Sequence, residues 1–339
     1  MIIQLAKNTD LSEKEDLKQK IGTFGIKVTE VRTQMGDYLI GIGNKDFDIR
    51  KIGHLKGVQD IHIVSDDYKL VSKKWKVKPT SIDLGDGIRI EDGSMAIIAG
   101  PCSIESEEQI ARVIQHLKEN NIKMMRGGVF KPRSSPYAFR GLGLDGLKWW
   151  YEQAKAAGIK IVTEVMQVSQ IEEMVDYVDI FQVGARNTQN FNLLDELGKV
   201  DKAVMIKRGI SGTIEELLQS AEYVFSGGNE KIILCERGIR TYERASRNTL
   251  DLNAVPILKS KSHLPVIVDP SHGIGIREFV PQMALAGVMS GADGIIYEAH
   301  ENPEKAYSDG QQTLNFQQSA LLAAQIRKTF ALRKTFQLL

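Results

Sequence analysis

Reactive side chains concentrate in residues 125–136, which read Met-Arg-Gly-Gly-Val-Phe-Lys-Pro-Arg-Ser-Ser-Pro. This stretch brings Arg126, Lys131 and Arg133 together with two serines just after a short apolar run. The glycine pair allows the backbone to approach a ligand closely. Arginine offers a planar fork of N–H donors and lysine a compact charge, which together suit an anion with several oxygens. A solvated basic loop is the alternative when the stretch is taken alone.

Cations also follow other apolar runs of the chain. The set comprises Arg126, Lys131, Arg186, Lys207 and Arg237. Crowded cations repel one another, so a cluster of this kind persists only where it neutralises bound anions. Five exceed what one carboxylate needs, and they predict a ligand that carries both phosphate and carboxylate. Each cation alone is equally compatible with an ordinary surface charge. Glu164 lies where it could hold one of the cations or orient a water.

A second set of residues offers ligands for a metal ion. Its members are Cys102, His272, Glu298 and Asp309. One sulfur, one imidazole and two carboxylates suit a borderline divalent cation such as Mn²⁺, Fe²⁺, Co²⁺ or Zn²⁺, and the sequence leaves the choice open. Individually these residues are compatible with a buried thiol, a turn histidine and solvated carboxylates. Their joint position after strand-like runs favours a metal site.

The apolar runs that precede these side chains predict eight strands. They are Ala96–Ala99, Lys123–Val129, Lys160–Val165, Ile180–Val183, Ala203–Lys207, Lys231–Cys235, Pro265–Val268 and Gly294–Tyr297. Helical periodicity falls between them, as in Leu144–Ala157 and Thr213–Phe225. The alternation predicts a closed (β/α)₈ TIM barrel with its site at the carboxyl ends of the strands. An open doubly wound sheet is less favoured, because no Gly-x-Gly-x-x-Gly turn opens a helix.

Residues 1–66 form a predicted domain of their own. Strand-like runs and two charged, helix-like stretches follow one another in the order βαββαβ, which is the ferredoxin-like arrangement. We expect a basic linker over residues 67–84 and the catalytic barrel over 85–339. A small hairpin around Ile88–Ile90 is positioned to plug the bottom of the barrel.

Composition limits the class of protein. The 339 residues carry a formal net charge of +1, which argues against a nucleic-acid or acidic-membrane partner. No apolar run approaches the ~18 residues that span a bilayer. Two cysteines make no disulfide framework and indicate a reducing compartment. We therefore expect a cytoplasmic enzyme.

The motifs Gly-Pro-Cys102-Ser, Met-Arg126-Gly-Gly, Lys-Pro-Arg133-Ser-Ser, Gly-Ala-Arg186-Asn and Asp-Pro-Ser-His272-Gly are jointly specific. From about residue 85 to 330 the chain resembles DAHP (3-deoxy-D-arabino-heptulosonate 7-phosphate) synthase. It resembles the short subtype with an N-terminal ferredoxin-like regulatory domain. The resemblance implies a transferase that condenses phosphoenolpyruvate with erythrose 4-phosphate and releases phosphate, the first step of the shikimate pathway to chorismate and the aromatic amino acids.

The resemblance also implies roles for the residues. Cys102, His272, Glu298 and Asp309 would bind the metal, and Cys102, Lys131 and His272 would be catalytic. Phosphoenolpyruvate would be held by Arg126, Lys131, Arg186, Lys207 and Arg237, with Glu164 nearby. Arg133 and Ser134 would bind the sugar phosphate. Feedback inhibition by Tyr or Phe through residues 1–66, and a homotetramer, are expected from the same subtype.

Three alternatives remain open at this point. The related octulosonate 8-phosphate synthase uses arabinose 5-phosphate, but its loop carries one more residue and an asparagine where this chain has Lys131-Pro132-Arg133. The barrel could bind its ligands without turnover. Residues 1–66 could serve oligomerisation only.

Overall fold

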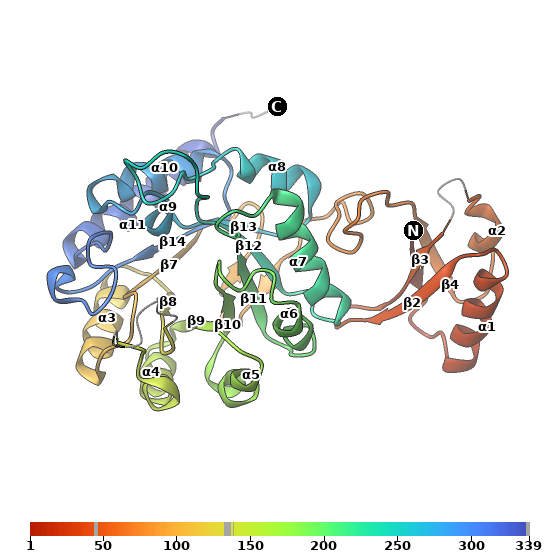
Figure 1. Ribbon diagram of the computed structural model, residues 1–339, viewed down its shortest axis with the longest axis horizontal. Helices are drawn as coiled ribbons and strands as arrows, with labels where there is room; N and C mark the ends of the chain where they lie inside the picture. The colour runs from red at the N-terminus through yellow and green to blue at the C-terminus, as the bar shows by residue number, and fades with distance from the viewer. Residues whose placement is uncertain (44–46, 132–136, 138, 337–339) are drawn as a thin grey trace.

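The computed structural model describes residues 1–43, 47–131, 137 and 139–336. The chain begins with β1 (Ile2–Leu5), α1 (Leu11–Gly22), β2 (Lys27–Arg32), β3 (Asp37–Ile42), α2 (Arg50–Gly53) and β4 (Val58–His62). These strands form a sheet of order β2-β3-β1-β4 in which all neighbours are antiparallel (Figure 1). The ferredoxin-like prediction is confirmed, with α2 a helix of only four residues.

Each face of this small sheet is covered. Buried residues of α1 and α2, among them Leu17 and Ile52, pack with Ile3 and Leu39 on one face. On the other face Tyr38 meets Trp75 edge to face, with ring centroids 5.3 Å apart. Trp75 also contacts Phe225 of the main domain, so it joins the sheet to the rest of the chain.

The main domain is a closed barrel of eight parallel strands. The strands are β7 (Ala96–Gly100), β8 (Met124–Gly127), β9 (Lys160–Val165), β10 (Ile180–Val183), β11 (Ala203–Lys207), β12 (Ile232–Glu236), β13 (Val266–Val268) and β14 (Gly294–Glu298). Closure comes from β14 pairing with β7, with Glu298 opposite Gly100. The predicted (β/α)₈ architecture is confirmed, because consecutive parallel strands need crossovers that the helices supply.

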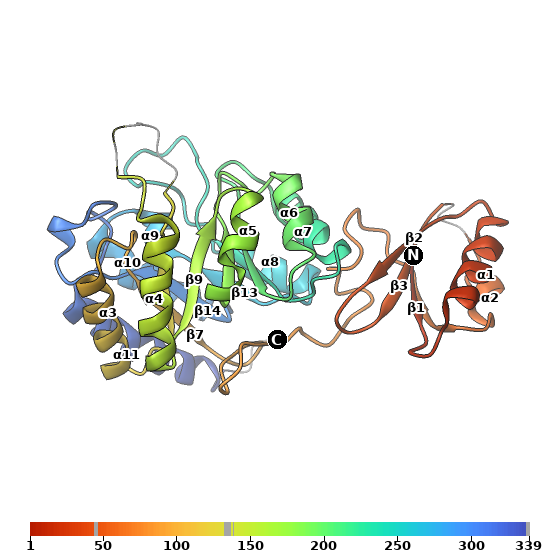
Figure 2. The same ribbon diagram turned by 90° about the horizontal axis from the view of Figure 1, so that it is seen from below.

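The helices of the main domain surround the barrel (Figures 1 and 2). They are α3 (Glu107–Glu119), α4 (Gly143–Ala157), α5 (Ser169–Met174), α6 (Phe191–Leu197), α7 (Ile214–Ser226), α8 (Ala254–Lys261), α9 (Pro270–Ile274), α10 (Val280–Met289) and α11 (Phe316–Arg333). Capping follows the sequence: Ser106 accepts from Gln109 N at the start of α3, and Thr213 and Glu216 form a capping box on α7. No helix among the described residues is long and apolar enough to cross a membrane.

A short hairpin closes one end of the barrel. It consists of β5 (Ile82–Asp83) and β6 (Arg89–Ile90). Ile82 and Ile90 are fully buried in one cluster with inward-facing strand residues such as Met124 and Ile267. The predicted plug is therefore present, and it closes the barrel interior at the end opposite the carboxyl ends of the strands.

The ferredoxin-like domain touches the barrel near that plugged end. The hydroxyl of Thr33 donates to the Glu230 carboxylate, and Gln34 Oε1 accepts from Glu230 N at 3.1 Å. Lys76 of the connecting segment lies 3.2 Å from the same carboxylate. Glu230 precedes β12, so these contacts are made at the amino end of that strand.

Candidate active site

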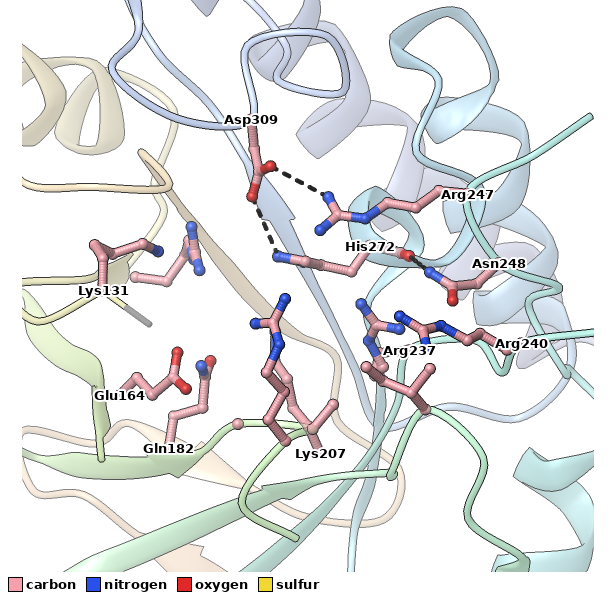
Figure 3. Close-up of a pocket in the computed structure, with 15 residues that line it drawn as sticks. Lys131, Glu164, Gln182, Lys207, Arg237, Arg240, Arg247, Asn248, His272 and Asp309 are labelled. Carbon is pink, nitrogen blue, oxygen red and sulfur yellow. Dashed lines mark hydrogen bonds and ion pairs between the residues drawn. The ribbon is translucent and has the colours of Figure 1, made fainter. Parts of the chain in front are cut away.

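The carboxyl ends of the barrel strands enclose a polar cavity of about 190 Å³ (Figure 3). Its walls come from several strand ends, including Arg126 in β8, Glu164 in β9, Gln182 in β10 and Lys207 in β11. All five cations that the sequence predicts line this cavity. The structure adds two from the loop after β12, Arg240 and Arg247.

Seven cationic side chains thus face two carboxylates, those of Glu164 and Asp309, among the described residues that line the cavity. Arg186, Arg237 and Arg240, here called the unpaired arginines, have no carboxylate within ion-pair distance in the described part of the chain. Arg186 and Arg240 are exposed. Arg237 is only 5% exposed, and its guanidinium donates to Gly238 O at 3.4 Å. Burial lowers the pKa of Arg237.

Unpaired buried charge is costly, since a cation removed from water loses its hydration without a partner to replace it. The arrangement is stable against this cost when an anion enters the cavity. Among the unpaired arginines only Arg237 is buried and bears this cost, while Arg186 and Arg240 add positive charge at the same cavity, so the three together suit a ligand with more than one negative charge.

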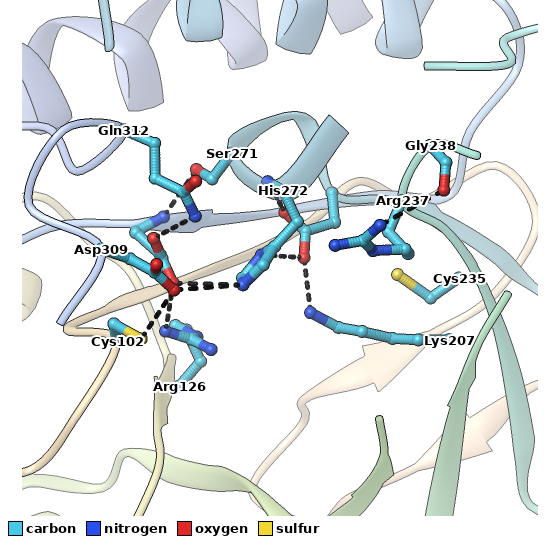
Figure 4. Close-up of polar contacts among 12 residues, drawn as sticks. Cys102, Arg126, Lys207, Cys235, Arg237, Gly238, Ser271, His272, Asp309 and Gln312 are labelled. Carbon is cyan, nitrogen blue, oxygen red and sulfur yellow. Dashed lines mark hydrogen bonds and ion pairs between the residues drawn. The ribbon is translucent and has the colours of Figure 1, made fainter. Parts of the chain in front are cut away.

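Lys207 and His272 share one carboxylate. Asp269 Oδ2 lies 2.5 Å from Lys207 Nζ and 2.8 Å from His272 Nδ1 (Figure 4). Burial alone would raise the pKa of Asp269, but His272 and Lys207 outweigh it and lower this pKa well below its usual value. Burial lowers the pKa of His272. A neutral imidazole therefore presents Nε2 to the cavity, and Asp269 orients the ring.

The four predicted metal ligands lie together, and are called the ligand cluster below. The Cys102 thiol donates to Asp309 Oδ2 at 3.3 Å. Cys102, Glu298 and Asp309 offer ligand atoms within 4.8 Å of one another. His272 Nε2 lies 3.4 Å from Glu298 Oε1 and 4.0 Å from Asp309 Oδ2, which places it at the edge of that group.

The separations of 3.3, 3.4 and 4.0 Å between ligand atoms fit a single ion. Metal–ligand bonds of about 2.0–2.3 Å place two ligands of one ion no more than about 4.6 Å apart. The donor set of one thiol, one imidazole and two carboxylates suits a borderline divalent cation. Burial raises the pKa of Asp309, but Arg247 and His272 outweigh it and bring this pKa to about 2. The carboxylate is therefore ionised at neutral pH, as a ligand must be.

Two cations border the ligand cluster. Lys131 Nζ lies 3.1 Å from Cys102 Sγ and donates to Cys102 O at 3.0 Å. Burial raises the pKa of the Cys102 thiol, and Lys131 opposes this effect. Arg126 donates to Glu298 Oε1 at 3.1 Å and to Pro101 O at 2.7 Å. The backbone of β8 at Arg126 lies close to the end of β7 because Gly100 has no side chain. A Cβ at Gly100 would lie 2.1 Å from Arg126 O.

Glu164 stands apart from the cations. Its side chain is half-buried and makes no hydrogen bond or ion pair with the described residues. Gly184 makes room for it, since a Cβ at that position would lie 2.0 Å from Glu164 Oε1. The carboxylate therefore faces the cavity and is available to a ligand or a water.

Some residues lie outside this account or were missed. Arg133 and Ser134 lie outside the described residues. Sequence reasoning missed Arg240 and Arg247, although four arginines follow β12 within eleven residues, at 237, 240, 244 and 247. Arg208 follows Lys207 at the end of β11, and its guanidinium donates to Glu236 at 3.0 Å and Asp251 at 2.7 Å. That side chain is structural.

Fold and site together define a (β/α)₈ barrel with a cation-lined cavity that suits a polyanionic ligand beside a candidate metal site. The chain belongs to the DAHP synthetase I family, whose model matches residues 74–335. The family is metal-dependent, and the Cys/Glu/Asp group of this chain could hold the ion. Its substrates are phosphoenolpyruvate and erythrose 4-phosphate.

Individual relatives agree with this assignment. Phospho-2-dehydro-3-deoxyheptonate aldolase of Thermotoga maritima is 48% identical, over 82% of this chain and 82% of the relative. A crystal structure of the DAHP synthase from that organism matches 98% of each chain at 43% identity, with a TM-score of 0.78. A 2-dehydro-3-deoxyphosphooctonate aldolase of Geobacter sulfurreducens is 30% identical over 72% of this chain and 95% of its own length. The octulosonate enzymes are thus more distant.

Proposed function

We propose that this chain condenses phosphoenolpyruvate with erythrose 4-phosphate to form DAHP and inorganic phosphate. The observation that carries the proposal is the joining of the unpaired arginines and the ligand cluster in one cavity. A ligand with a phosphate and a carboxylate offsets the cationic excess. Family membership supplies the reaction, in the aromatic amino acid pathway.

Phosphoenolpyruvate is held by the five predicted cations, Arg126, Lys131, Arg186, Lys207 and Arg237. Their fixed positions offset its charges and hold it in contact with the second substrate. Arg133 and Ser134 are proposed for the sugar phosphate. Attack of water at C2 of the condensed intermediate then expels phosphate, and Glu164 is proposed to orient that water because its carboxylate is otherwise free.

Cys102, His272, Glu298 and Asp309 would hold a divalent cation, and Cys102, Lys131 and His272 are proposed as catalytic. When bound, the cation supplies a Lewis acid that polarises the aldehyde of the sugar phosphate. Lys131 favours the thiolate of Cys102, because its ammonium lies 3.1 Å from the sulfur. Asp269 keeps His272 oriented with Nε2 toward the cavity.

The direct test is phosphate release from the two substrates, measured with and without a chelator. We expect turnover that is lost on chelation and restored by Mn²⁺, Fe²⁺, Co²⁺ or Zn²⁺. Absence of phosphate release with all four metals would favour the alternative that the barrel binds its ligands without turnover. A faster rate with arabinose 5-phosphate than with erythrose 4-phosphate would favour the octulosonate reaction, which more distant relatives carry in their names.

We further propose that residues 1–66 form the regulatory domain, 67–84 the linker and 85–339 the catalytic barrel of a cytoplasmic homotetramer. Both cysteines are free, as a reducing compartment allows. The domain contacts the barrel at the amino end of β12, through Thr33, Gln34 and Glu230, and leaves the cavity accessible. Its effect on turnover would therefore depend on movement of the domain.

Deletion of residues 1–66 tests this assignment. We expect the shortened chain to release phosphate at a rate near that of the full chain, but without inhibition by Tyr or Phe. Sedimentation of both chains separates the alternative, because a domain that only mediates assembly changes the oligomer and leaves no effector response in either chain.

A further inference from the structure

We infer that Gln312 is a positioning residue that fixes the orientation of Glu298 in the ligand cluster. The inference rests on the proposed metal site and concerns what holds one of its carboxylates in place. Gln312 belongs to the loop after β14 and was not among the residues that the sequence singled out. Its side chain lies next to the ligand cluster in Figure 4.

The loop returns alongside the strand that it leaves. Leu314 N donates to Glu298 O at 3.0 Å, and His300 N donates to Leu314 O at 2.9 Å. This pairing brings the turn at residues 309–312, closed by a 3.2 Å bond from Gln312 N to Asp309 O, over the end of β14. Gly310 allows the turn to pack tightly, since a Cβ there would lie 2.2 Å from Pro303 O.

Gln312 Nε2 donates to Glu298 Oε2 at 2.7 Å, and the Gln312 side chain is fully buried. Thr313 Oγ1 is a more distant donor to the same oxygen, at 3.4 Å. The other oxygen, Oε1, faces Arg126 and His272. Gln312 therefore determines which carboxylate oxygen of Glu298 is turned toward the cavity.

The second end of the amide extends the support to another ligand. Gln312 Oε1 accepts from Arg247 at 2.6 Å, and the same guanidinium nitrogen lies 3.3 Å from Asp309 Oδ1. The other carboxylate oxygen of Asp309, Oδ2, faces Cys102. One neutral, buried amide thus links the supports of both carboxylates. Partners of this kind orient metal ligands, and their removal typically weakens metal affinity by about 10- to 100-fold.

The test is titration of the metal-free full chain with Mn²⁺, with free Mn²⁺ followed by its paramagnetic resonance signal. We expect Gln312→Met to weaken Mn²⁺ binding by about 10- to 100-fold. Its neighbour provides a matched control: Gln311 is exposed and its side chain has no partner in the described chain. Gln311→Met should bind Mn²⁺ as the wild type does.

Two further variants keep the experiment decisive. Gln312→Asn keeps an amide but is too short to span Glu298 and Arg247, and it replaces Gln312→Met if that variant does not fold. Arg247→Met leaves the hydrogen bond from Gln312 to Glu298 intact. Its loss of Mn²⁺ affinity should therefore be smaller than that of either Gln312 variant. The visible spectrum of the Co²⁺ form should change in the Gln312 variants.

The outcomes separate clearly. Equal Mn²⁺ affinity in the wild type and both Gln312 variants, with only a lower Tm, would assign Gln312 to stability and overturn the inference. Failure of the wild type itself to bind Mn²⁺ would overturn the proposed metal site instead.

Discussion

At the ends of β13 and β14, His272 Nε2 lies 3.4 Å from Glu298 Oε1 and 4.0 Å from Asp309 Oδ2, and these side chains are fixed by neighbours. At the ends of β10 and β12, by contrast, Arg186 and Arg237 have no carboxylate within ion-pair distance in the described chain. Other protein side chains hold the ligand cluster in place, whereas the unpaired arginines require an anion from solution to balance their charge. Removing a residue from the ligand cluster should therefore lower the stability of the ligand-free protein. Removing a buried unpaired arginine such as Arg237 should raise it.

The largest effect is expected from Cys102→Ser. A serine preserves the size of the side chain but removes the sulfur ligand, and a bound Lewis acid contributes several kcal/mol to this kind of chemistry. We expect phosphate release to fall about 1,000-fold, since each 1.36 kcal/mol is tenfold in rate. Steady-state assays with saturating Mn²⁺ measure the change. A wild-type rate in this variant would show that Cys102 is not a required metal ligand.

Arg237→Met sharpens the comparison from the other side. The guanidinium is buried without a carboxylate, so its removal relieves a desolvation cost in the free protein but deprives the substrate of a cation. We expect kcat/KM for phosphoenolpyruvate to fall about 100- to 1,000-fold and the Tm of the ligand-free protein to rise. Calorimetry and kinetics on one preparation provide both values. A lowered Tm would mean that interactions of Arg237 in the free protein outweigh the cost of burying its charge.

Phosphoenolpyruvate should stabilise the wild type by occupying the same region. At a concentration 100 times its Kd, the ligand adds about 2.7 kcal/mol to the free energy of unfolding. Arg186→Met should show a smaller gain at the same concentration, because its affinity is lower. Denaturant titrations with and without ligand make the comparison, and equal gains in both proteins would exclude Arg186 from the contact.

The smallest effect concerns acid. The pKa of Asp309 is lowered from 3.8 to about 2, so its ionised form stabilises the fold above pH 4 and this contribution is lost as pH falls through 2. In metal-free protein, the stability difference between wild type and Asp309→Asn should narrow by about 2 kcal/mol between pH 5 and pH 2. Urea titrations at the two pH values measure it. A constant difference would contradict the shifted pKa.

The fold was largely predictable from local patterns. Strands such as Lys160–Val165 and Ala203–Lys207 have the predicted bounds, because buried parallel strands read as continuous apolar runs. The lone Cys102 and the carboxylate Glu298, each ambiguous by itself, became informative because both follow such runs.

Prediction failed where position depends on loops. Arg247 and Gln312 reach the site only because the loops after β12 and β14 fold back over the rim, and no periodicity encodes that path. The pairing of Arg208 with Glu236 and Asp251 was missed for a similar reason: its partners are 28 and 43 residues away.

The β5–β6 hairpin closes one end of the barrel, so the interior opens at the carboxyl ends of the strands. Two substrates and two products must share that opening, because the opposite end is sealed by Ile82 and Ile90. We therefore expect substrates and products to bind and leave in a fixed order, although the hairpin lies at the opposite end of the barrel from the cavity.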